Sequence, residues 1–401
     1  MSVGTTAGRS RGPLSNATYR RLLAAQVIAL TGTGLTTVAL TLLAYDLAGR
    51  DAGAVVGVAL ALKMSVYAFG APVITELAAK LPRRRLLVTL DLLRAGTVVG
   101  MLFVTQVWQV YVLIVLVNAC SAGFSPTFDA TIPDLLVDER AYTRALSFAR
   151  LAEELEGIVS PALAAVLLAF VSYRGLFVAN SVAFVCSAAL VLSTTLPAPG
   201  RREHEASRWR RFTFGTRRFL ADARLRGVLA LKLTIAMGSA TVVVNTVVYV
   251  RHAMGRPASD VAWALGAAGV GAMLCALAVP RLLERVRDRT AMLAGGAIVV
   301  AGLALAVPIG GFGLLLADWL LMGAGFSLVL TPANRVVNTC GSAEERPALF
   351  AANFSLSHGA WLAAYPIAGV LGATIGLSAT AAVLAALAAA ALALAALVWR
   401  E

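Results

Sequence analysis

Long apolar runs of about 20 residues, separated by short polar connections, follow one another along the chain. A helix that crosses the roughly 30 Å hydrocarbon layer of a bilayer needs about 20 predominantly apolar residues. Turn residues such as Gly310 and Gly311 separate neighbouring runs. The pattern therefore predicts about twelve transmembrane helices, with approximate spans at 22–45, 53–75, 86–106, 108–128, 149–171, 174–195, 226–250, 259–280, 290–309, 311–331, 347–372 and 376–399.

The composition supports this prediction and excludes an ordinary water-soluble domain. Hydrophobic residues make up 59% of the 401 positions, charged residues make up 14%, and the mean hydropathy is +0.81. In water-soluble domains about a quarter of the residues are charged. The four cysteines show no paired spacing, so neither a disulfide framework nor a zinc site is indicated. We therefore predict an all-α integral membrane protein.

The net charge of +13 is distributed unevenly along the chain. Most of the 34 Lys and Arg residues lie in the termini and in alternate connections, which is the positive-inside pattern of cytoplasmic segments. The sequence thus predicts a multi-pass plasma-membrane protein with both termini in the cytoplasm. Its basic charge is expected to contact anionic lipid and does not indicate nucleic acid. The exceptions are Arg50, Arg174, Arg251 and Arg256 in the opposite connections, and Lys63, Arg94 and Lys232 within spans.

The longest connection, residues 196–225, divides the chain into two sets of six predicted helices. It contains RREHEASRWRRFTFGTRRF, whose arginines and aromatic residues predict an amphipathic helix on the membrane surface. A regulatory or partner site is the alternative interpretation of this segment. We predict an N-terminal half over 1–195, a basic cytoplasmic linker over 196–225 and a C-terminal half over 226–401.

The two halves share short stretches of sequence at one constant offset. SAGFSPTFD at 121–129 corresponds to GAGFSLVLT at 323–331, and LPRRR at 81–85 corresponds to LERVR at 283–287, both at an offset of 202. Each pair falls at the matching helix or loop of its six-helix set. The pattern predicts two parallel pseudo-repeats, an architecture of secondary transporters.

The loop after the second predicted helix, ITELAAKLPRRRLL at 74–87, resembles the conserved loop of the major facilitator superfamily, Gly-x-x-x-Asp-Arg-x-Gly-Arg-Arg. The resemblance implies the major facilitator fold over essentially the whole chain and a cytoplasmic gating role for this loop. Lys80, Arg83 and Arg84 match its basic positions, whereas Thr75, Ala79 and Pro82 replace its Gly, Asp and Gly. Asp91 and Arg94 on the next helix are candidates for a substitute ion pair.

Other stretches are similar to the nickel-resistance-type exporters of that superfamily. They are ALKM at 61–64, SPTFDATIPDLL at 125–136, YTRALSFARL at 142–151, SPALAA at 160–165 and SLSHGAWLAAYPIAG at 355–369. This resemblance implies export of a divalent cation such as nickel. Many of those exporters end in a histidine-rich tail, whereas this chain ends in VWRE.

A lysine lies near the middle of the second predicted helix. Lys63 is about ten residues, or ~15 Å, into that helix. A charge at the bilayer centre costs at least ~2.5 kcal/mol on insertion scales, so Lys63 is expected to face the interior of the bundle. Candidate acidic partners cluster in the fifth helix, as Glu153, Glu154 and Glu156, where clustered carboxylates favour a proton carrier. The alternatives are a structural ion pair for Lys63 and a solvated helix end for the glutamates.

The eleventh helix carries a polar and aromatic stripe. His358, Trp361 and Tyr365 recur at helical spacing, and alignment of Pro161 with Pro366 puts His358 opposite Glu153 in the repeat. A histidine serves as a proton relay or as a ligand of a soft divalent metal, so His358 is also the candidate metal ligand. A neutral imidazole satisfied within the bundle is the alternative.

Further polar positions indicate a cavity between the halves. Asp318 in the tenth helix is a proton or cation candidate. The expected cavity-lining residues are Gln26, Tyr67, Thr241, Asn245, Trp361 and Tyr365.

The chain lacks a Gly-x-x-x-x-Gly-Lys-Ser/Thr loop and any motif of catalytic nucleophile and base. We therefore expect no enzyme activity, no cofactor, and a proton gradient as the energy source. The preferred hypothesis is a monomeric, proton-coupled exporter of a divalent cation such as nickel that works by alternating access. The alternatives are an exporter of a small apolar organic compound or drug, and a membrane scaffold or receptor without transport.

Overall fold

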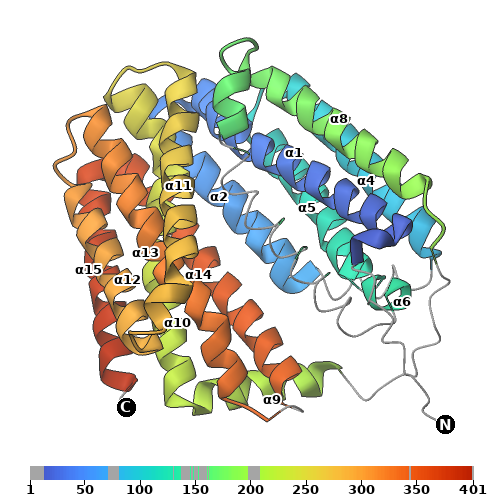
Figure 1. Cartoon of the computed structure of the whole chain (residues 1–401). Coiled ribbons are helices and arrows are strands. Elements are labelled where there is room, and N and C mark those ends of the chain that lie inside the picture. The colour runs from blue at the N-terminus through green and yellow to red at the C-terminus, as the bar shows by residue number, and fades with distance from the viewer. Residues whose placement is uncertain are drawn as a thin grey trace, which may run out of the picture.

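A computed structural model describes residues 13–70, 81–129, 131–136, 145, 148, 152, 160, 162–196, 208–342 and 345–399. All regular elements in these ranges are helices (Figure 1). Nine apolar helical stretches of the described residues are long enough to cross a membrane, and the first of them joins two helices over Ala17–Ser65. The described residues therefore confirm the predicted all-helical membrane fold.

The N-terminal helices follow the predicted spans closely. They are α1 (Ala17–Ala48), α2 (Ala52–Ser65), α4 (Arg83–Gly100), α5 (Val107–Asp129), the short α6 (Ile132–Leu135) and α8 (Tyr173–Leu192). A π-helical turn over Val66–Gly70 extends α2, and a 3-10 turn over Met101–Phe103 extends α4. The predicted span 149–171 is described only at 152, 160 and 162–171, and within it 162–167 form a continuous helical stretch.

The C-terminal helices match their predicted spans equally well. They are α10 (Ala223–Ala240), α11 (Ala258–Leu283), α12 (Asp288–Leu305), α13 (Phe312–Thr339), α14 (Arg346–Thr374) and α15 (Leu377–Val398). The sequence predicts one regular helix over 226–250, but in the structure α10 continues in two π-helical turns, Thr241–Asn245 and Val248–Ala253. Single π-helical turns inside helices are frequent at functional sites.

Local signals explain where the helices begin. Asn16 caps α1, because its side chain accepts hydrogen bonds from the backbone N–H groups of Thr18 and Tyr19. Asp222 caps α10 in the same way. Between α14 and α15 the chain turns at Gly376, whose φ of 84° is readily adopted by glycine alone.

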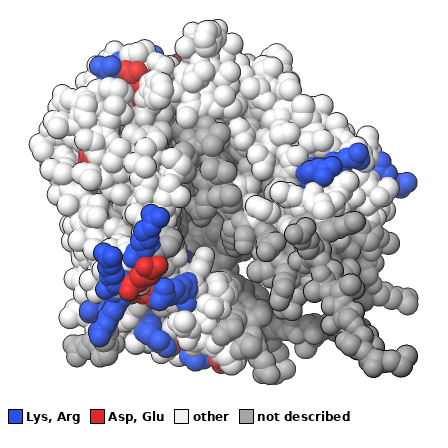
Figure 2. All heavy atoms as spheres, viewed as in Figure 1, with Lys and Arg blue, Asp and Glu red and all other residues white. Residues whose placement is uncertain are grey.

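The predicted amphipathic helix of the linker is α9 (Arg208–Ala221). It packs against the beginning of α14, where Arg218 forms an ion pair with Glu345 at 3.2 Å. The start of α1, α9 and the end of α15 lie at one end of the bundle (Figure 1). On the face in Figure 2 the largest group of basic side chains lies at this end, and most of the face above it carries no charge. This distribution suits a membrane-spanning bundle, and the cytoplasmic orientation of this end stays a prediction.

Two sets of helices pack among themselves and meet along α2 and α14 (Figure 1). In the N-terminal set α8 packs on α1 and α4, and in the C-terminal set α13 packs on α11 and α12. α14 is long but is not among the nine apolar stretches of the described residues, because polar residues such as Asn353 and His358 interrupt its apolar sequence. A comparatively polar long helix therefore lies where the two sets meet.

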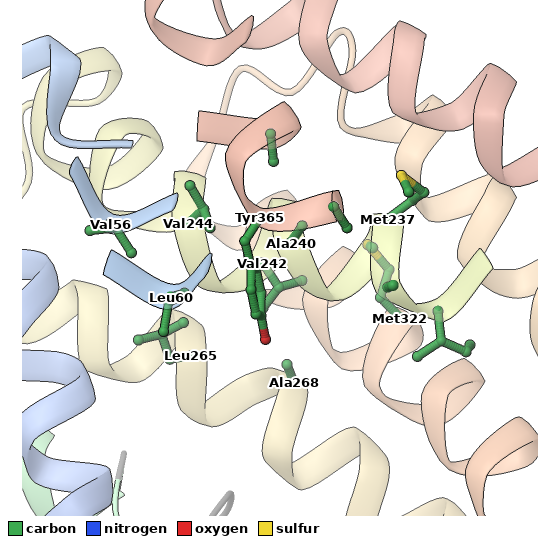
Figure 3. Close-up of a cluster of buried hydrophobic side chains, with 14 of the residues drawn as sticks. Val56, Leu60, Met237, Ala240, Val242, Val244, Leu265, Ala268, Met322 and Tyr365 are labelled. Atoms are coloured by element: carbon green, nitrogen blue, oxygen red, sulfur yellow. The ribbon is translucent and has the colours of Figure 1, made fainter. Parts of the chain in front are cut away.

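Glycines allow α2 and α14 to approach closely at the end of the bundle away from α9. A Cβ atom on Gly57 would lie 2.5 Å from the carbonyl oxygen of Tyr365, and one on Gly369 would lie 2.3 Å from that of Gly53. Small residues of this kind permit backbone contact between membrane helices. Next to this crossing, Val56 and Leu60 of α2 join a cluster of buried side chains from α10, α11, α13 and α14 (Figure 3).

Candidate functional site

Lys63 lies in the last turn of α2, half-buried, where α2 passes α14. In the part of the chain that the structure describes, no hydrogen-bond or ion-pair partner is found for its ammonium group. The lysine lines a cavity of about 40 Å³ between α1, α2, α5 and α8, which is room for a few water molecules. The inward orientation expected for an intramembrane charge is therefore what the structure shows.

The mostly apolar wall of this cavity includes several side chains that can accept hydrogen bonds. Asn180 of α8 is 1% exposed and donates to the hydroxyl of Thr36 at 2.5 Å, while its own Oδ1 has no partner among the described residues. The hydroxyl protons of Thr33 and Ser121 go to helix carbonyls, so their lone pairs are left for the cavity. The wall thus suits water or the ammonium group of Lys63.

His358 lies on α14 opposite the end of α2. Its Nδ1 is 2.8 Å from the carbonyl oxygen of Phe354, and because a carbonyl only accepts, Nδ1 carries the proton. The Nε2 atom is then left to accept a proton or to bind a metal. The imidazole lies beside Tyr67, with ring centroids 6.4 Å apart, and Lys63 lies within electrostatic reach of it. The structure therefore brings Lys63, Tyr67 and His358 together where α2 meets α14, and their expected roles in proton coupling stay a prediction.

Lys232 is a second intramembrane lysine, for which the sequence predicted no role. It lies on α10, is 6% exposed, and its Nζ donates to Asn353 Oδ1 at 2.7 Å and to Ser357 Oγ at 2.8 Å on α14. Both acceptors are neutral, and Lys232 also acts electrostatically on His358. The signal that singled out Lys63, a charge inside an apolar run, applies equally to Lys232.

Asp91 and Arg94 form a buried ion pair on α4. Ser187 of α8 donates to the second carboxylate oxygen of Asp91 at 2.7 Å, and the guanidinium group of Arg94 lies over the rings of Phe124 and Phe184 at 4.3 and 4.4 Å. The pair thus joins α4, α5 and α8 within the N-terminal set. A gating role for it stays a prediction.

The remaining residues of the predicted gating loop are only partly described. Arg83 begins α4, and Arg84 donates to the carbonyl oxygen of Leu192 at the end of α8. Lys80 lies outside the described residues, as do Glu153, Glu154 and Glu156. Their expected roles in gating and proton binding stay predictions.

Most of the expected cavity-lining residues are packed between helices. Trp361 donates to Ser239 of α10 at 3.3 Å, and Asn245 donates to the carbonyl oxygen of Ala368 at 3.3 Å. Tyr365 points into the cluster of apolar side chains in Figure 3. Gln26 and Thr241 are also buried, and the hydroxyl of Thr241 donates to the carbonyl oxygen of Met237 in its own helix at 3.2 Å.

Asp318 is buried in α13 and lies apart from the group around Lys63 and His358. Among the described residues, no three His, Cys, Asp or Glu side chains converge in a way that could hold a metal ion. His358 is thus a single candidate ligand, and its role in metal binding stays a prediction.

Comparison with known proteins identifies a family and relatives of this chain. The model of the family described as Major Facilitator Superfamily matches residues 22–255. The uncharacterized MFS-type transporter YfiS of Bacillus subtilis (strain 168) is 26% identical over 379 residues, which are 89% of this chain and 87% of that protein. Macrolide efflux protein A of Enterococcus faecalis is 27% identical over 156 residues, which are 36% of this chain and 48% of that protein.

Solved transporter structures share the fold at low sequence identity. A bacterial homolog of the human lysosomal transporter Spinster, in an inward-facing and unoccupied conformation, has a TM-score of 0.77 and 13% identity over 98% of both chains. A point mutant of the nucleoside transporter NupG has a TM-score of 0.76 and 13% identity over 95% of this chain and 100% of its own. With the family model covering more than half of the sequence, the chain belongs to the Major Facilitator Superfamily and is a transporter rather than an enzyme.

Proposed function

We propose that this protein is a proton-driven secondary transporter that exports a small organic compound from the cytoplasm. The observation that carries the proposal is the group formed by Lys63, Tyr67 and His358 where α2 meets α14. A charge in the membrane is costly and normally marks a substrate or ion pathway. These side chains belong to two helix sets whose relative movement would expose them to either side in turn.

An organic substrate suits the described residues better than a divalent cation does. Lys63 and Lys232 both place positive charge near His358, which would repel a metal ion. The aromatic rings of Tyr67 and Phe354 flank the imidazole, with Phe354 at a centroid distance of 4.0 Å, and offer apolar contact area. A nickel site would need several converging ligands, and His358 would have to find the others outside the described residues.

Export is favoured over import by two similarities. The relative from Enterococcus faecalis is named as a macrolide efflux protein, and short motifs of the chain resemble exporters of the superfamily. Because the chain lacks a phosphate-binding loop for ATP, an ion gradient is the expected source of energy. A macrolide antibiotic is therefore the first organic probe, and nickel is the competing one.

Flux measurements in inverted membrane vesicles with an acid interior test this proposal. We expect uptake of the macrolide erythromycin to dissipate the proton gradient in wild type, and Lys63→Ala to reduce that uptake at least tenfold. Lys63→Ala removes the intramembrane charge, whereas the control Arg50→Ala removes an exposed arginine in the turn between α1 and α2 and should transport normally.

The compound that is transported distinguishes the possible outcomes of this measurement. Proton-coupled uptake of nickel without uptake of erythromycin would replace the organic substrate by a divalent cation. Transport at the wild-type rate in Lys63→Ala would remove the proposed site. The absence of coupled flux with any of a panel of organic compounds and metals would favour the scaffold or receptor hypothesis.

A further inference from the structure

Asp318 is a buried carboxylate whose two oxygen atoms both lack a hydrogen-bond partner in the described part of the structure. The residue is 4% exposed and lies on α13 among the C-terminal helices. The other buried acid of the described spans, Asp91, has the opposite environment, because Arg94 and Ser187 both contact its carboxylate. Of the two acidic residues that are buried among the described residues, Asp91 is thus satisfied and Asp318 is not.

No described residue around Asp318 provides a positively charged side chain that pairs with its carboxylate. On the α12 side, Gly302 lies so close that an added Cβ would be 2.9 Å from Asp318 Oδ1, and Met322 packs on the same glycine. On the α10 side, Tyr249 is the titratable group that faces the carboxylate, and its hydroxyl donates to the carbonyl oxygen of Ala306 at 3.1 Å. No charged group of α11, α12 or α14 among the described residues acts on Asp318.

The polar groups next to this carboxylate form their hydrogen bonds with other groups. The indole N–H of Trp319 donates to Thr246 Oγ1 at 2.7 Å, and Thr246 in turn donates to the carbonyl oxygen of Val242. The ring of Tyr249 packs edge-on against Trp319, with centroids 5.8 Å apart. An ionised carboxylate without a partner in such a site is strongly disfavoured, whereas the neutral acid is tolerated.

We propose that Asp318 is a proton-binding site of this transporter, and that it holds its proton in the present conformation and releases the proton to water when the helices rearrange. The inference rests on the proposed proton-driven transport and names the group that couples it. Tyr249 lies in the π-helical turn Val248–Ala253 of α10, so the wall of the site belongs to an irregular segment that can change its hydrogen-bonding pattern. A proton suits the site better than a metal cation, because a cation needs several converging oxygen ligands.

Infrared spectroscopy of the purified full-length protein in lipid tests the protonation directly, without any substrate. We expect a carboxylic acid C=O band at neutral pH that shifts in D₂O and disappears in Asp318→Asn. The control is Asp51→Asn, because Asp51 is exposed, forms a surface ion pair with Arg50 at 3.7 Å and should leave the band unchanged. A band of equal intensity in wild type and Asp318→Asn would overturn the proposal.

Transport in proteoliposomes tests the coupling. Erythromycin is the probe, and two rates are measured: its uptake driven by a proton gradient, and its exchange across the membrane at equal pH on both sides. Asp318→Asn should reduce the gradient-driven uptake by a factor at least ten times larger than the factor by which it reduces the exchange. Two results would overturn the proposal. One is gradient-driven uptake at the wild-type rate in Asp318→Asn, and the other is erythromycin uptake that a sodium gradient drives in place of a proton gradient.

Two further comparisons distinguish a wrong choice of substrate, or a variant that does not fold, from a wrong assignment of the proton site. If wild type carries no erythromycin, the proposed cargo fails, and the infrared result alone decides whether Asp318 holds a proton. If Asp318→Asn does not fold, Asp318→Glu replaces it in the infrared experiment. That variant keeps the acid, so a displaced C=O band is expected, and an unshifted band would count against Asp318 as its source.

Discussion

Replacement of Gly369 by leucine is expected to force α2 and α14 apart and to abolish transport. A Cβ atom at this position would lie 2.3 Å from the carbonyl oxygen of Gly53 and 3.0 Å from the Cα atom of Ala54. Both neighbours are backbone atoms of α2, so no side chain can rotate to make room. Overpacking of this kind typically costs about 1–3 kcal/mol, and a leucine that meets backbone falls at the upper end of that range.

A second glycine of the same helix provides the matched control for this prediction. Gly359 also lies on α14, but an added Cβ there would meet no described atom within 4 Å. Thermal unfolding of the purified proteins and vesicle transport should show a large loss for Gly369→Leu and little change for Gly359→Leu. Equal behaviour of the two variants would show that close contact of α2 and α14 is not required for transport.

Removal of Arg94 is expected to be among the most destabilising single changes in the N-terminal helices. Arg94→Met leaves the carboxylate of Asp91 buried without its cation, and breaking a buried ion pair typically costs about 3–5 kcal/mol. The methionine retains apolar contact with Phe124 and Phe184, so most of the loss comes from the unpaired charge. Thermal or denaturant unfolding in detergent measures the effect.

The double variant Asp91→Asn with Arg94→Met separates charge from packing. It removes both charges and should recover much of the stability that Arg94→Met loses, because no uncompensated charge stays buried. Ser187 can still donate to the amide oxygen of the asparagine. A double variant as unstable as Arg94→Met would mean that the guanidinium acts through the aromatic rings and not through Asp91.

The transmembrane helices were predictable because the bilayer imposes one simple requirement on sequence. Each span needs a continuous apolar run, and eleven of the predicted spans coincide with helices of the described residues, from α1 at Ala17–Ala48 to α15 at Leu377–Val398. The basic linker similarly indicated the amphipathic helix α9. The sequence did not predict the π-helical turns of α10, because a single extra residue in a helical turn leaves no signature in hydropathy.

The candidate site was predictable in part. Lys63 and His358 stand out because charged and titratable residues are rare in apolar runs, and the antiparallel contact of α2 with α14 brings them together. The direction in which each side chain points, and the partners that it finds, depend on helix rotation and packing that hydropathy does not encode. Asn353 and Ser357 could therefore not be recognised as the acceptors of Lys232.

The sequence by itself determined that this is an all-helical membrane protein with charges placed inside its spans, because the free energy of transferring each run into lipid depends on composition. Only the tertiary structure decided which of these charges are satisfied. Asp91 and Asp318 are both acids within apolar helices, and of the two only Asp91 has an arginine, Arg94, three residues further on in the sequence. They differ because one meets Arg94 and Ser187 and the other meets no described partner. The Asp91–Arg94 pair lies within one helix, whereas the bond from Ser187 to Asp91 and the lack of a described partner for Asp318 depend on contacts between helices. The unpartnered carboxylate of Asp318 identifies it as the proposed proton site.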